Sequence, residues 1–385
     1  MGDRHVAAVC LGAGVLAFAL AACGSGGGAS PAPNPRPTLS SAPLTLTAFT
    51  LGGGEQNVIA PGSPGLQYTP DEHMPFLRQT DGTFKLWASG GGSYGAYLFH
   101  TPDLFSLGAP TTVFGPSGAG TTAFDADYAG PGSIFPAANG TDLLMIYHAE
   151  NHLFSGVDYA GAPFYAGIGL ARSHDGGVTW VRQGEIVSGH DPQQPTQAPQ
   201  GAGALTPTAV ESGAFIYLVF REIDLQSQVA GYGIARAPVS SDGAPGSWQK
   251  YAQGSFSTPG LGGSFTPLNI VLDPTVPGDM RQPHVSFNTY LNQYVMVTVG
   301  NGGIYVLTSP DLLTWTPGIV ALAAPVPDST ATNSDVKNWY PTLVSPSQPS
   351  DELTAQSGFL YYAKFLGDGT SDHYLYRQAF TIMGH

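Results

Sequence analysis

Hydrophobic and polar positions along this chain alternate in short runs, with no helical period, which predicts β-strands separated by tight turns. An apolar run at 84–87 follows Asp81-Gly82, and another at 143–147 follows Asn139-Gly140. Asp-Gly and Asn-Gly between apolar runs are strong signals for β-hairpins. We therefore expect an all-β protein.

One turn motif recurs along the chain. Residues 173–180 read Ser-His-Asp-Gly-Gly-Val-Thr-Trp, a complete Asp box (S-x-D-x-G-x-T-W), also known as a BNR repeat. Weaker copies surround Asp103, Asp242 and Asp311, so the motif returns at a period of about 70 residues. We expect each Asp to cap backbone N–H groups of a turn, with Gly at positive φ and Trp packed beneath, and to carry no chemistry.

The period divides the chain into units of similar pattern, each opening with a Pro- or His-containing strand and continuing with two apolar strands. A repeat of this length favours one radial array over several domains. The innermost strands are expected near 73–77, 133–136, 205–208, 282–285 and 339–343. The sequence therefore predicts a five-bladed β-propeller.

The last unit lacks a box and a fourth strand, whereas residues 44–49 alternate like an unattached strand. We expect this N-terminal strand to complete the last blade and close the ring, which removes free sheet edges.

The N-terminal region has the pattern of an export signal. Arg4 and His5 precede an apolar run at 6–20, and residues 20–23 (Leu-Ala-Ala-Cys) fit a lipobox. We expect residues 1–22 to be a lipoprotein signal peptide, 23–43 a flexible Gly/Ser/Pro tether and 44–385 the propeller. Lipidated Cys23 would anchor the protein on the extracytoplasmic side of the bacterial cell envelope.

Changing Cys23→Ser should move the protein from the membrane fraction to the soluble fraction without unfolding it, because only the acceptor of the lipid is lost. Fractionation followed by immunoblotting measures this. A variant that stays with the membrane would show that the anchor lies elsewhere.

Composition narrows the function further. The net charge is −14 without any Lys/Arg cluster, which argues against nucleic acid as a partner. Of the two cysteines, Cys10 lies within the signal, so the mature domain has no thiol chemistry. A monomer with no cofactor is expected, and its many aromatic residues suit stacking on sugars.

Polar residues gather where the blade pattern places one rim of the propeller, before the first strand and after the second strand of each unit. The catalytic candidates are the carboxylates Asp71, Glu150 and Glu222, because glycoside hydrolysis needs one neutral acid and one ionised carboxylate. The substrate-binding candidates are Glu72, His73, Asp125, Asp127, His148, Asn151, His152, Arg221, Arg281 and Trp339.

A metal ion in the central channel of the propeller is an alternative to this metal-free site. If the strand continues, His148, Glu150 and His152 project to one face, and these residue types are metal ligands. No other spacing in the chain supports a zinc site.

The Ser-x-Asp-Leu-x-x-Trp form around Asp311 resembles turns of five-bladed glycosidase propellers of the arabinanase and fructosidase type, and the full box resembles those of sialidases. The first resemblance implies Asp71 as the base, Asp125 or Asp127 as its helper and Glu222 as the acid. The chain departs from the pattern at 201–204, where Gly-Ala-Gly-Ala stands in place of an acidic residue.

These patterns lead to a lipoprotein that binds and hydrolyses a neutral glycan, such as an arabinose- or galactose-containing polymer. The alternatives are a non-catalytic carbohydrate-binding or adhesion propeller and a sialidase-like exo-glycosidase. Sialidases typically have six blades and an arginine triad. Arg78, Arg221 and Arg281 are the arginines that such a triad could use, but the sequence shows no sixth unit.

Overall fold

The computed structural model describes residues 42–90, 94–118, 121–152, 164–193, 201–224, 230–272 and 280–385. This part of the chain is almost entirely β-strand, and its helices are the single turns η2 (Val239–Ser241) and η3 (Asp328–Thr330). No helix in the described ranges is long and apolar enough to cross a membrane. The prediction of an all-β fold is confirmed.

The strands are short and follow one another closely along the chain. Their bounds are β1 (Leu46–Asn57), β2 (Phe76–Arg78), β3 (Phe84–Gly90), β4 (Gly95–Thr101), β5 (Thr111–Phe114), β6 (Tyr128–Pro136), β7 (Leu143–Asn151), β8 (Tyr165–Ser173), β9 (Val181–Ser188), β10 (Ala202–Ser212), β11 (Phe215–Ile223), β12 (Ala230–Pro238), β13 (Gln249–Ala252), β14 (Ser255–Pro259), β15 (Arg281–Asn288), β16 (Gln293–Gly300), β17 (Gly303–Ser309), β18 (Ile319–Ala323), β19 (Val336–Val344), β20 (Leu353–Thr354), β21 (Ser357–Leu366) and β22 (His373–Gly384).

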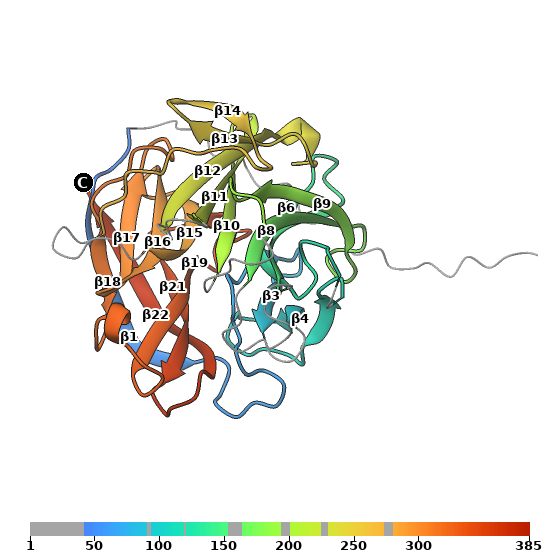
Figure 1. Cartoon of the computed structure of the whole chain (residues 1–385). Helices are drawn as coiled ribbons and strands as arrows, with labels where there is room; N and C mark the ends of the chain where they lie inside the picture. Colours follow the sequence, from blue (N-terminus) through green and yellow to red (C-terminus); the bar gives the residue numbers. More distant parts are fainter. Residues whose placement is uncertain are drawn as a thin grey trace, which may run out of the picture.

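Neighbours in sequence pair antiparallel, which gives the groups β2–β5, β6–β9, β10–β14, β15–β18 and β19–β21–β22. A short parallel pairing between β8 and β10 joins the second and third groups into one sheet. Figure 1 shows the groups succeeding one another around the molecule, from β3 and β4 through β10 to β22.

Hydrogen bonds also connect the first group to the last. The backbone N–H of Phe76 donates to Asp351 at 3.1 Å, and that of Met74 donates to the Thr342 hydroxyl at 3.4 Å. Residues before β2 therefore lie against β19, although more than half the chain separates them.

The N-terminal strand lies where the sequence pattern indicated, on the outer edge of the last group. β1 pairs antiparallel with β22, from Leu46 opposite Gly384 to Asn57 opposite Tyr376. The strand is longer than the predicted run 44–49, because it continues past a shift in register between Gly52 and Gln56. Phe49 stacks on Phe380 with ring centroids 5.2 Å apart, so the strand is held by its side chains as well as by its backbone.

The repeated turns are closed by their aspartates. Asp175 accepts hydrogen bonds from the backbone N–H groups of Val178 and Thr179 at 3.1 and 2.9 Å. Asp311 and Asp103 cap the N–H groups two and three residues further on in the same way. These carboxylates are occupied by their own turns, in agreement with a structural role.

Asp242 is an exception among the repeated aspartates. Its carboxylate accepts from the backbone N–H of Ala138 at 2.7 Å and lies 2.5 Å from the guanidinium of Arg172. This copy of the motif therefore ties two neighbouring groups together and does not cap its own turn.

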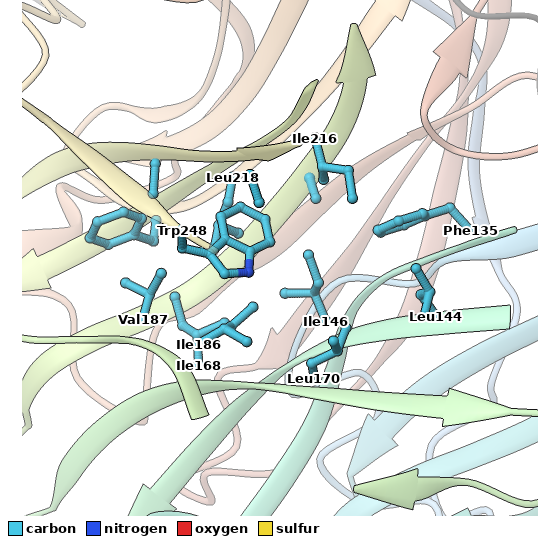
Figure 2. Close-up of a cluster of buried hydrophobic side chains, with 14 of the residues drawn as sticks. Phe135, Leu144, Ile146, Ile168, Leu170, Ile186, Val187, Ile216, Leu218 and Trp248 are labelled. Atoms are coloured by element: carbon cyan, nitrogen blue, oxygen red, sulfur yellow. The ribbon is translucent and has the colours of Figure 1, made fainter. Parts of the chain in front are cut away.

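A large apolar cluster between the second and third groups fixes the strands that carry the site (Figure 2). Trp248 lies beside Ile186 and Val187 of β9, and the cluster continues to Phe135 and Ile216. All these side chains are buried. The end of β9 is therefore held close to β11 and β13.

Candidate active site

Two segments distant in sequence meet at one end of the sheets. Asp71 and Glu72 precede β2, whereas His148 and Glu150 end β7 and His152 follows it. His148 Nδ1 bonds the Glu72 carboxylate, and His152 Nε2 lies 2.8 Å from Glu150 Oε2. Strand alternation places positions 148 and 150 on one face of β7. We call these five residues the carboxylate–histidine cluster.

Two tyrosines position Asp71. The hydroxyl of Tyr340 donates to Asp71 Oδ1 at 3.0 Å, and that of Tyr128 donates to the Asp71 carbonyl at 2.9 Å. Tyr340 has φ of 51°, a left-handed conformation that costs a non-glycine residue on the order of 1 kcal/mol. Its N–H donates to the Gln282 side chain at 3.0 Å, which helps to hold this backbone in place.

Burial and neighbouring charge set the protonation of the cluster. Burial, followed by the charges of Glu150 and Glu72, raises the pKa of Asp71 to about 8. Burial also raises the pKa of Glu72, against the opposing effect of His148. Burial opposes a charged His148, but the carboxylates of Glu72, Glu150 and Asp71 outweigh it and raise the pKa of this imidazole. Near neutral pH Asp71 therefore carries a proton.

The cluster retains polar atoms that can face a ligand. Within the described part of the chain, Glu72 Oε2 and His148 Nε2 are buried without a hydrogen-bond partner. His148 Nε2 lies 3.6 Å from Glu150 Oε1, and the side chain of Glu150 remains 15% exposed. Solvent, or a substrate oxygen, can therefore approach Glu150.

His73 lies beneath the cluster in the interior. Its ring centroid is 5.6 Å from that of His284, and both residues are fully buried. Burial, and then the neighbouring imidazole of His284, holds the pKa of His73 well below its usual value. His73 is therefore a neutral residue, and no direct contact joins it to the carboxylates.

Arg281 and Trp339 lie together on neighbouring groups. Arg281 forms an ion pair with Asp328 at 2.8 Å, and the Trp339 indole N–H donates to the same carboxylate at 3.1 Å. The guanidinium is 5.6 Å from the centroid of the indole ring. Both side chains are half-buried, and they form an aromatic and cationic surface next to Tyr340.

Two further candidates support the cluster from outside it. Asp127 accepts a hydrogen bond from the backbone N–H of His152 at 2.7 Å, and this fixes the segment after β7. The amide of buried Asn151 donates to the carbonyl of Ala123 at 2.6 Å. Both residues therefore hold His152 and its neighbours in place.

Asp125 belongs to another set of contacts. Its carboxylate accepts from the hydroxyl of Tyr147 at 3.0 Å and from Arg182 Nε at 2.6 Å. Arg221 lies half-buried in β11. Neither residue makes a described contact with the carboxylate–histidine cluster.

Glu222 is also separated from the cluster. Its Oε1 accepts from the backbone N–H and from Nδ1 of His190, both at 2.7 Å, and its Oε2 lies 3.0 Å from the Lys250 ammonium. Lys250 is completely buried and donates in addition to the Ser188 carbonyl at 2.6 Å. Both carboxylate oxygens of Glu222 are therefore occupied by fixed partners, and breaking such a buried pair costs about 3–5 kcal/mol.

Sequence reasoning missed Tyr128 and Tyr340, although each directly follows a residue that was singled out, Asp127 and Trp339. The available signal for both tyrosines was that each stands next to a candidate residue in the first strand of its unit. The sequence carries no such signal for Lys250 and His190, because their contacts with Glu222 depend on the packing of β9 against β13.

The structure shows an all-β protein with a carboxylate–histidine cluster at one end of its sheets. No known protein family matches the sequence, and no curated protein matches it significantly. The fold, in contrast, is similar to those of solved glycoside hydrolases.

Among these is an α-L-arabinofuranosidase from Lactobacillus brevis, with a TM-score of 0.51 and 14% identity over 83% of this chain and 92% of that chain. Another is Zg3597, a family 117 glycoside hydrolase of the marine bacterium Zobellia galactanivorans, with a TM-score of 0.50 and 11% identity over 88% and 90% of the two chains. At these identities the similarity is one of fold.

Proposed function

We propose that this protein is a glycoside hydrolase with a five-bladed propeller, closed by β1, and that Asp71 and Glu150 are its catalytic carboxyl groups. The observation that carries the proposal is the position of Asp71, buried near the carboxylates of Glu150 and Glu72, which raises its pKa to about 8. Hydrolysis of a glycosidic bond requires a carboxyl group that can donate a proton and a second carboxyl group close to it.

In this mechanism the proton of Asp71 passes to the glycosidic oxygen as the bond to the anomeric carbon breaks. Glu150 stabilises the positive charge that develops on the sugar ring. Water then adds its hydroxyl group to the anomeric carbon and returns its other proton to the Asp71 carboxylate. The raised pKa of Asp71, about 8, favours the acid role over the base role that the resemblance implied.

The remaining cluster residues orient this pair. His148 lies between Glu72 and Glu150 and contacts both carboxylates, which keeps Glu150 in place. Tyr340 fixes the proton-bearing carboxyl of Asp71. Trp339, with Arg281 beside it, offers a flat surface on which a sugar ring can stack.

The charge of the chain favours a neutral glycan. A net charge of −14 repels anionic sugars, and Arg281, the arginine beside Trp339, is paired with Asp328. Both points argue against a sialidase. The proposal includes a lipid anchor at Cys23 that holds a monomeric enzyme against its glycan at the cell envelope.

A panel of polysaccharides tests the function. The purified protein should release reducing ends from neutral arabinose- or galactose-containing polymers and none from polygalacturonate, the anionic control. Binding to a neutral polymer without release would favour the carbohydrate-binding alternative, with the aromatic surface at Trp339 as its site. If the protein neither hydrolyses nor binds any of the polymers, both the hydrolase proposal and the carbohydrate-binding alternative are refuted.

A further inference from the structure

A second group of ligand-type side chains lies at the ends of β9 and β11. His190 and Asp191 follow β9, and Asp224 follows β11. Among the residues that the structure describes, these three are the group of His, Asp and Glu side chains whose ligand atoms all lie within 4.8 Å of one another. We propose that His190, Asp191 and Asp224 bind a divalent transition-metal ion such as Zn²⁺.

The distances match a coordination shell. His190 Nε2 lies 3.2 Å from Asp224 Oδ2 and 3.5 Å from Asp191 Oδ1. Zinc bonds to imidazole and carboxylate of about 2.0–2.2 Å in a tetrahedron place neighbouring ligand atoms about 3.4 Å apart. An ion can therefore enter among these three atoms with little rearrangement of the side chains.

Glu222 supplies the support that metal-binding histidines usually have. It accepts a hydrogen bond from Nδ1 of His190 at 2.7 Å, and Nε2 is the ring atom that faces Asp191 and Asp224. A carboxylate behind a histidine ligand fixes its ring and tautomer and raises its basicity. Glu222 is itself 1% exposed and fixed by Lys250, so this support is rigid.

The carboxylates of Asp191 and Asp224 carry charge opposite to that of a divalent cation, and Lys250 pairs with Glu222 behind them. One imidazole with two carboxylates suits Zn²⁺ or Mn²⁺, whereas Ca²⁺ prefers a shell of six to eight oxygen atoms.

The site is open to solvent and lies beside the carboxylate–histidine cluster. The side chains of His190, Asp191 and Asp224 are 31%, 23% and 29% exposed. Gln193 donates to Asn151 at 3.3 Å, which joins this segment to the end of β7. Three protein ligands leave a coordination position for water or a sugar hydroxyl. The metal site does not depend on the proposed hydrolysis.

Calorimetric titration of the full-length protein with Zn²⁺, after removal of bound metal by a chelator, tests the site. One equivalent should bind to the wild type. His190→Asn keeps an N–H donor for Glu222 but removes Nε2, and it should weaken binding at least about tenfold. Asp224→Asn should do the same. His174→Asn is the matched control, since His174 pairs with Asp142 at 3.0 Å elsewhere and is 65% exposed; it should bind as the wild type does.

Thermal unfolding separates loss of the site from loss of the fold. The metal-free variants should melt close to the metal-free wild type, and Zn²⁺ should raise the melting temperature of the wild type and of His174→Asn only. Absence of saturable Zn²⁺ binding to the wild type would overturn the proposal. So would equal affinities of His190→Asn and the control. All measurements are made without glycan, so failure of the hydrolase proposal leaves their outcome unchanged.

Discussion

Asp71→Asn should lower kcat on the hydrolysed glycan by roughly two to four powers of ten while leaving KM nearly unchanged. The asparagine keeps the size of the side chain and an oxygen for the Tyr340 hydroxyl, which lies 3.0 Å from Asp71 Oδ1. It removes the proton that the leaving group needs. Release of reducing ends over a range of glycan concentrations gives both constants, and Glu150→Gln should show a loss of similar size.

Asp368→Asn is the control for this substitution. Asp368 is exposed and caps Thr370 at 3.0 Å, and none of its described contacts involves the cluster, so turnover should be unchanged. Wild-type kcat should fall as the pH rises through about 8, because Asp71 then loses its proton. An Asp71→Asn variant that keeps at least half of the wild-type kcat would remove Asp71 from the mechanism.

The raised pKa of Asp71 also makes the free energy of unfolding depend on pH, and this can be measured without a substrate. An unfolded Asp releases its proton near pH 4, whereas folded Asp71 holds it to about pH 8. The folded state therefore binds the extra proton in this window, and its stability falls as the pH rises. Asparagine does not titrate, so the free energy of unfolding of the wild type should decrease relative to Asp71→Asn between pH 4 and 8.

Deleting residues up to Thr50 should destabilise the protein by at least about 3 kcal/mol. The deletion removes Phe49, which is 7% exposed and stacked on Phe380, and burial of a phenylalanine alone contributes about 3–5 kcal/mol. It also leaves much of β22 as an open sheet edge. Chemical denaturation, with the same slope for both chains, measures the difference.

Deletion of residues up to Pro37 is the matched control, because it leaves β1 intact and should change the free energy of unfolding little. Phe49→Ala should reproduce most of the loss without shortening the chain. Equal melting temperatures of the two truncated proteins would mean that β1 contributes nothing to the fold.

Local signals in the sequence predicted the strands well. The Asp81-Gly82 and Asn139-Gly140 turns precede β3 and β7, as a hairpin signal should. The length of β1 could not be predicted in the same way. Gly52, Gly53 and Gly54 indicate a loop, but pairing with β22 carries the strand past them to Asn57.

The positions of the catalytic candidates could be predicted from the sequence, but their contacts could not. Asp71 and Glu150 were expected at the same rim, and the structure brings them together because β2 and β7 belong to neighbouring groups. Glu222 occupies the equivalent position of the next unit, but its environment depends on Lys250 from β13. The position of Glu222 in the repeat predicted that it lies at the end of a strand. Which residues its side chain contacts depends on tertiary packing, which the repeat does not predict.

The pairing of β1 with β22 imposes an order on folding. Thr50 donates to the Thr381 carbonyl across 331 residues of chain, so β1 cannot pair until β22 has been synthesised. Contacts of such separation form late, because the intervening chain has to be ordered before they become favourable. During synthesis the apolar face of β1 has no partner, and a nascent chain with such a strand is prone to aggregate. The pairing of β1 can therefore form only after β22 has left the ribosome.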